Sequence, residues 1–189
     1  MDAIEAIRRR TSVRRFSAAP VARETIAQLL ECAVRAPNHK LTEPWRFAVL
    51  TGRACARFAE LRVRHRLQRY RDPESPEASA GAEKVRREAL GTPAFVVVSC
   101  ALHPDDLTRE EDYAAAMMAT ATLMIAAEAL GLGTYLRTGG IMGLPELADL
   151  IGLDDGFRVV GVVSVGYPAE PNAPVRRRPA AELTRWVDG

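Results

Sequence analysis

Five arginines and two hydroxyl side chains stand together in the segment from Arg8 to Phe16, at the predicted end of a first helix. Guanidinium groups bind phosphate oxygens in pairs, and Thr11 and Ser12 add directed donors. The segment is therefore suited to a phosphate monoester. A solvated basic helix end remains the alternative interpretation of the same pattern.

Two further segments could contact a flat ligand. In the segment from Arg35 to Trp45, Pro37 ends a helix and a short polar loop leads into a strand. Loops held rigid at both ends often carry ligand-contacting groups, although His39 taken alone is more typical of a structural loop histidine. In Gly131–Gly140 the glycines permit close backbone approach and Arg137 offers donors, but such glycines alone usually only form turns.

Together the three segments resemble the nitroreductase family, within it the small single-domain subgroup that carries an APxHKxxxPW-type loop. The resemblance runs nearly end to end, through the RxS element, the RAPNHKLTEPWRF loop, the acidic entry Glu110–Asp112 to a long apolar helix, and GLGTYLRTGG. It implies an α+β fold with a central mixed β-sheet flanked by helices. It also implies an intertwined homodimer with FMN at the subunit interface and NAD(P)H as electron donor.

The resemblance assigns cofactor-binding residues position by position. Arg10, Thr11 and Ser12 match the family's N-terminal FMN-binding triplet, with Arg10 and Ser12 as the phosphate contacts. Thr11 departs from the pattern, since a second arginine is common there. The other matching positions are Arg14 near the flavin pyrimidine, Arg35 and His39 in the loop, and Leu136, Arg137 and Thr138 along the isoalloxazine.

Some of these assignments carry further implications. His39 is expected to reach the flavin bound mainly by the other subunit. Leu136 stands where the subgroup can carry an aromatic residue, which bears on ring stacking and substrate fit. Arg177 resembles a tail arginine that touches phosphate in larger relatives, and we leave it out of the predicted site.

The resemblance implies a mechanism in which the cofactor, and no catalytic side chain, carries the chemistry. The nicotinamide delivers hydride to flavin N5, and a fixed arginine, Arg14 or Arg35, stabilises the negative charge that develops over N1 and O2. The acceptor then occupies the same cleft, which gives ping-pong kinetics. Nitroaromatics and quinones are the acceptors that the family suggests.

Three other functions are compatible with parts of the sequence. Cys100 and His103 could form a nucleophile and base, although a buried strand cysteine is more typical of this pattern. The arginine-rich ends could belong to a non-enzymatic basic binding module, but no nucleic-acid motif accompanies them. A flavoenzyme of the same fold could instead consume flavin, dehalogenate or dehydrogenate a specialised substrate.

The composition agrees with one ordinary globular domain over residues 1–189. A hydrophobic fraction of 48% allows a sizeable core, and a net charge of +2 gives no field that demands nucleic acid or a membrane surface. The sequence lacks a secretory signal, a membrane span and a CxxC pair. We therefore expect a cytoplasmic protein without a metal site.

The elements that must position these residues follow from periodicity and breakers. We expect a first helix capped by Asp2 with Ile4 and Ile7 facing inward, and a helix capped by Thr108 that ends at Gly131. Only Glu128 is charged between Ala114 and Leu130, so this helix needs burial by helices, a sheet or a second subunit. The remaining expected elements are helices at 23–36, 52–69 with its arginines outward, and 145–151, strands at 45–51, 94–99, 134–136 and 159–165, and an exposed mobile insertion, a plausible lid, at Asp72–Gly81.

Overall fold

The computed structural model describes residues 1–171 and 175–187, and it confirms the α+β class. Its helices are α1 (Ala3–Arg9), α2 (Arg23–Ala33), α3 (Arg53–Leu67), α4 (Pro76–Leu90), α5 (Asp106–Ala129) and α6 (Pro145–Ile151). Its strands are β1 (Trp45–Thr51), β2 (Ala94–Ala101), β3 (Gly133–Arg137) and β4 (Phe157–Gly166), and short 3-10 helices occupy His39–Leu41, Gly140–Gly143 and Ala180–Leu183. Among the described helices, none combines the length and apolar character that a bilayer crossing requires.

The four strands form one sheet in the order β1-β2-β4-β3, and every neighbouring pair is antiparallel. The mixed sheet expected from the resemblance is therefore wrong for the strands of this chain. The two helices α3 and α4 return the chain to the edge where β1 ended, so β2 runs opposite to it. The single helix α5 makes β3 parallel to β2, but β4 lies between them and separates the parallel pair.

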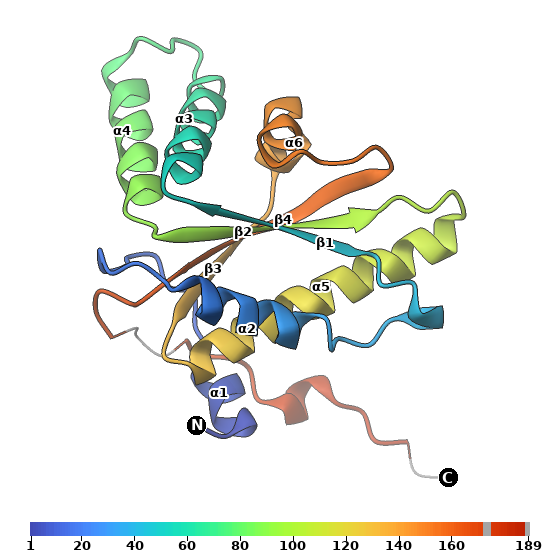
Figure 1. The fold of residues 1–189 in the computed structure, drawn as a ribbon. Coiled ribbons are helices and arrows are strands. Elements are labelled where there is room, and N and C mark those ends of the chain that lie inside the picture. The colour runs from blue at the N-terminus through green and yellow to red at the C-terminus, as the bar shows by residue number, and fades with distance from the viewer. Residues whose placement is uncertain (172–174, 188–189) are drawn as a thin grey trace.

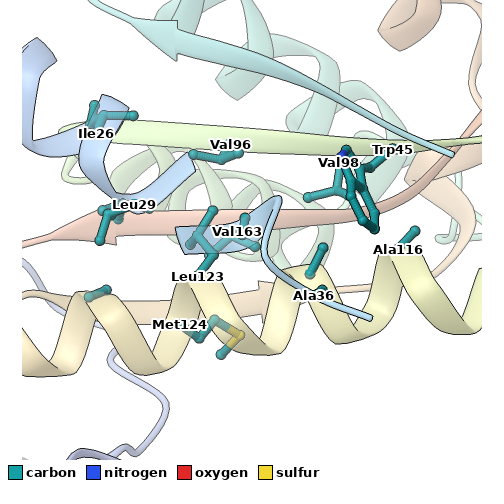
Figure 2. Packing of buried hydrophobic residues seen from close by; sticks show 14 of the residues in the cluster. Ile26, Leu29, Ala36, Trp45, Val96, Val98, Ala116, Leu123, Met124 and Val163 are labelled. Atoms are coloured by element: carbon teal, nitrogen blue, oxygen red, sulfur yellow. The ribbon is translucent and has the colours of Figure 1, made fainter. Parts of the chain in front are cut away.

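The sheet is covered on both faces. Figure 1 shows α1, α2 and α5 on one side of the sheet and α3, α4 and α6 on the other. Strand β2 alternates between these layers, with Val96 and Val98 facing α5 while Phe95 and Val97 face α3. All four side chains are fully buried, which agrees with the continuous apolar run of a central strand. In Figure 2, Leu123 and Ala116 of α5 point toward the sheet that lies above them.

Several expected helix ends shift. Asp105 caps α5 instead of Thr108, since its carboxylate accepts the Thr108 N–H at 2.8 Å. The segment predicted as an exposed insertion begins α4: Ser75 accepts the Ala78 N–H at 3.2 Å, and Pro76 occupies the first turn. The start of this helix was predicted as a loop because a capping serine, a proline and small residues are also typical of loops. Ala78 is fully buried.

The first helix buries a different face from the one that its amphipathic pattern predicts. Asp2 caps it as predicted, accepting the Glu5 N–H at 2.8 Å. Its buried residue is Ala6, while Ile4 and Ile7 are 60% and 54% exposed. The apolar face expected to turn inward therefore lies open in the single chain.

Candidate functional site

The segment after α1 is held against β3. The Val13 N–H donates to the Thr134 carbonyl at 2.8 Å, and Ser12 forms a parallel bridge with Thr134. The Val13 side chain occupies the space beside Gly133, where an added Cβ would meet its carbons at less than 3.0 Å. Because β3 starts with glycine, the first and third chemical segments of the sequence lie side by side.

A cavity of about 730 Å³ lies beside this contact, between α1, the end of α5 and the tail. Its cations include Arg10 and Arg177. Arg9 lies 3.7 Å from a Glu128 oxygen, whereas neither Arg10 nor Arg177 pairs with a carboxylate among the described residues. Thr11 lines the same cavity. Its hydroxyl, together with the unpaired guanidinium groups of Arg10 and Arg177, suits a phosphate group.

Arg177 was left out of the predicted site, yet it lies in this cavity with Arg10. The only sequence signal was its resemblance to a tail arginine of larger relatives. Arg177 lies more than 160 residues after α1 in the sequence. No local periodicity in the sequence could show that the two come together in space.

Tyr135 holds two of the predicted site arginines. The guanidinium carbons of Arg14 and Arg137 lie 5.2 and 4.5 Å from its ring centroid, within the range of cation–π contact. Burial lowers the pKa of Arg137, and the charge of Glu88 opposes that shift. The two cations are thus fixed beside the half-buried Leu136, and Thr138 lies exposed just beyond them.

A second cavity, of about 390 Å³, lies between α3 and the end of β3. Arg62 of α3 is 9% exposed, and it shares Glu88 with Arg137 at N–O distances of 3.7 and 3.9 Å. Burial, followed by repulsion from Arg137, lowers the pKa of Arg62 to about 10. Arg62 is therefore buried, and the prediction that all arginines of this helix face outward is wrong for it.

The second chemical segment follows α2 and packs against the start of α5. His39 Nδ1 lies 2.7 Å from a Glu111 oxygen, and the Thr42 hydroxyl donates to the buried Asp112 carboxylate at 2.7 Å. Within the loop, Lys40, Leu41 and Glu43 have φ values of 54°, 52° and 44°. Such left-handed non-glycine residues each cost about 1–3 kcal/mol and persist where the surroundings hold them, often at functional sites.

One chain brings two of the three segments together and keeps the third apart. Glu111, which contacts His39, and Glu128, which lines the first cavity, are 17 residues apart on one helix. At the helical rise per residue this spacing is about 25 Å. Arg35 is exposed next to Ala36, and Figure 2 shows Ala36 near Ala116, toward the His39 end of α5. The predicted site residues that do gather near β3 are Arg10, Thr11, Ser12, Arg14, Leu136, Arg137 and Thr138.

Cys100 and His103 do not form a nucleophilic pair. Cys100 is buried, and burial with the nearby charge of Asp112 raises the pKa of its thiol to about 11. His103 Nδ1 accepts the Asp105 N–H at 3.1 Å. A buried neutral thiol is inert, so this alternative loses its chemical basis.

Known proteins resemble this chain over most of its length. The sequence profile described as "Nitroreductase family" matches residues 7–167. The chain is 28% identical to a Bacillus subtilis protein provisionally named NAD(P)H nitroreductase YfhC, over 92% of this chain and 88% of that protein. A nitroreductase-like family protein from Bacillus cereus is 29% identical, with a TM-score of 0.82 over 100% of this chain and 97% of its own. A provisionally named nitroreductase from Desulfovibrio desulfuricans, crystallised with FMN, shares the fold at 23% identity and a TM-score of 0.75, with 100% and 98% coverage.

Substituting Gly133→Ala should separate the first segment from β3. The new Cβ would collide with Val13, so we expect the free energy of unfolding to fall by about 1–3 kcal/mol. Amide hydrogen exchange should also become faster at Val13, whose N–H bonds Thr134. Gly143→Ala is the matched control, because an added Cβ there meets nothing within 4 Å. Unchanged protection of Val13 in Gly133→Ala would refute this role of the glycine.

Proposed function

The chain belongs to the nitroreductase family, and we propose that it is an FMN-dependent NAD(P)H oxidoreductase. The family match, an FMN-bound structure among its fold neighbours and the name of the Bacillus subtilis relative support this assignment. We further propose one FMN-binding domain over residues 1–189, acting as a cytoplasmic homodimer. Three free cysteines are compatible with a reducing compartment.

The observation that carries the proposal is the convergence of the Arg10–Arg14 segment with the end of β3 beside a basic cavity. Arg10 and Ser12 would hold the phosphate of FMN, with Thr11 beside them. Leu136, Arg137 and Thr138 would line the flavin ring. The donor set fits this group, since Arg10 and Arg177 of this cavity have no carboxylate partner among the described residues, although Arg9 pairs with Glu128. The cavity volume of about 730 Å³ lies within the usual size range of ligand pockets.

Arg14 is the better placed of the two arginines considered for charge stabilisation. It is held at Tyr135 together with Arg137. Arg35 of the same chain adjoins Ala36, which Figure 2 shows near Ala116 in the first half of α5. A positive charge fixed in advance stabilises negative charge that develops beside it without further reorganisation. When bound, FMN would supply the redox chemistry between NAD(P)H and a nitroaromatic or quinone-like acceptor in a ping-pong reaction, and the residues above would hold it in place.

A second copy of the chain would complete the site. His39 and Arg35 lie too far from the first cavity of their own chain to contact a ligand there. Exposed apolar side chains mark where the copy would pack, including Ile7 of α1 and Met118 of α5, which is 41% exposed. The end of the described chain, after the 3-10 helix Ala180–Leu183, extends away from the body in Figure 1, and Trp186 is 82% exposed. A tail with such an exposed tryptophan is suited to wrapping a partner subunit.

The direct test of this function is anaerobic reduction of the FMN-loaded protein. We expect the yellow protein to bleach on addition of NADH or NADPH, and to regain its colour when a nitroaromatic or a quinone follows. Steady-state rates with both substrates varied should give parallel double-reciprocal lines. A protein that cannot be reconstituted with FMN, or whose bound FMN stays oxidised with both donors, would contradict the proposal.

Arg10→Ala should weaken FMN binding specifically through the phosphate. Loss of a charged hydrogen bond predicts a decrease of about 1.5–3 kcal/mol in binding free energy. Fluorescence titration of the apoprotein measures this, and riboflavin, which lacks the phosphate, is the internal control whose affinity should not change. An equal loss for riboflavin, or no loss for FMN, would remove Arg10 from the phosphate contact.

A further inference from the structure

The second cavity has a positively charged wall that the proposed cofactor site does not explain. We call it the arginine pocket, lined on one side by Arg62, His65 and Arg66 of α3 with Arg69 just after its end, and on the other by Arg137 and Thr138. In the described part of the chain, its lining includes no aspartate or glutamate. Arg62 and Arg66 are four residues apart, so they share a face of α3, and Arg69 lies in the turn that follows the helix.

Buried polar atoms of the described chain lack hydrogen-bond partners in this pocket. Arg62 Nη1, Arg66 Nε, Arg137 Nε and His65 Nδ1 are all buried, and none has a hydrogen-bond partner among the described residues. Arg62 as a whole is only 9% exposed. Buried polar groups in folded proteins are almost always hydrogen-bonded, so the three guanidinium N–H groups around one cavity point to a ligand that accepts hydrogen bonds.

The charge in the pocket is also uncompensated. Glu88 is the carboxylate that contacts it, and its distances of 3.7 Å to Arg62 and 3.9 Å to Arg137 are too long for hydrogen bonds. One carboxylate therefore faces two guanidinium groups, and Arg66 and Arg69 add to the excess. A second negative charge would offset the repulsion that Arg62 and Arg137 exert on each other.

The shape of the pocket suits a small organic anion. Its volume is about 390 Å³, and Val85, Leu136 and Ile141 give it apolar walls. The backbone of Gly140 packs against His65, where an added Cβ would lie 3.1 Å from the ring. The planar guanidinium fork binds two oxygens of a carboxylate or phosphate at once.

We propose that the arginine pocket binds the oxyanion group of a reactant, either a carboxylate on the electron acceptor or a phosphate on the nicotinamide donor. This inference rests on the proposed function, because Leu136, Arg137 and Thr138 would then serve the flavin on one side and the pocket on the other. The pocket would orient a charged reactant toward the ring and favour it over a neutral analogue.

Binding is tested first without turnover, by isothermal titration calorimetry of the purified protein with sodium benzoate and sodium phosphate. We expect binding of at least one anion, weakened about tenfold or more by Arg66→Gln. Arg62→Gln is the second variant, and Arg64→Gln is the charge-matched control, since Arg64 is exposed on the same helix and outside the pocket. No binding of either anion, or an equal loss in Arg64→Gln, would overturn the proposal.

Kinetics of the FMN-loaded enzyme then separate the two sources of the oxyanion. A selective loss of kcat/KM for 4-nitrobenzoate over 4-nitrobenzamide in Arg66→Gln identifies the acceptor's carboxylate. A selective loss for NADPH over NADH identifies the donor's 2′-phosphate. Equal losses for charged and neutral reactants would contradict the proposal.

The cofactor's own phosphate is the competing occupant. If Arg66→Gln weakens FMN binding about tenfold and leaves riboflavin binding unchanged, the pocket holds that phosphate and the proposal is wrong. Failure of the proposed function has a different signature, namely FMN that is not bound or not reduced. The calorimetric result on anion binding stands in either case.

Discussion

Residues 12–17 are tied to the protein on both sides, and the candidate site depends on this double attachment. On one side the Val13 N–H donates to Thr134 of β3 at 2.8 Å, and on the other the Ser17 N–H donates to the Tyr167 carbonyl at 2.8 Å, just after β4. Arg15 and Glu170 add an ion pair at 2.6 Å between exposed side chains, which contributes little by itself. Because the backbone is fixed in this way, Arg10, which precedes the segment, lines the first cavity, and Arg14 within the segment is held at the Tyr135 ring.

The long helix α5 sets the second constraint. Its 24 residues span about 36 Å, with the basic cavity at its end and the strained His39 loop near its start. Buried alanines let it pack closely under the sheet, while Met118 and Tyr113 remain more than a third exposed. A rigid spacer of this length means that His39 and Arg10 can meet only if they come from different copies of the chain.

Much of the fold could be predicted because its signals are local. A few consecutive residues are enough to predict the apolar run of β2, the Asp2 cap and the helix that begins at Pro145. The predicted site residues near β3 came from motif resemblance, and their juxtaposition required the Gly133 contact. The antiparallel sheet and the inward Arg62 could not be predicted, since strand order and the tolerance of a buried cation depend on distant partners such as β4 and Glu88. The start of α4 was missed because Ser-Pro-Glu reads equally as a turn and as a helix cap.

Subunit complementation tests the central claim most directly, namely that one flavin site takes Arg10 from one chain and His39 from the other. Arg10→Ala and His39→Ala homodimers would each be impaired at both sites, whereas a mixed dimer of the two variants contains one intact site and one doubly altered site. FMN content and NAD(P)H-dependent reduction of separately tagged, purified mixed dimers give the readout. The account predicts recovery of about half the wild-type FMN and activity per dimer. Mixed dimers no better than the two parent variants would contradict it.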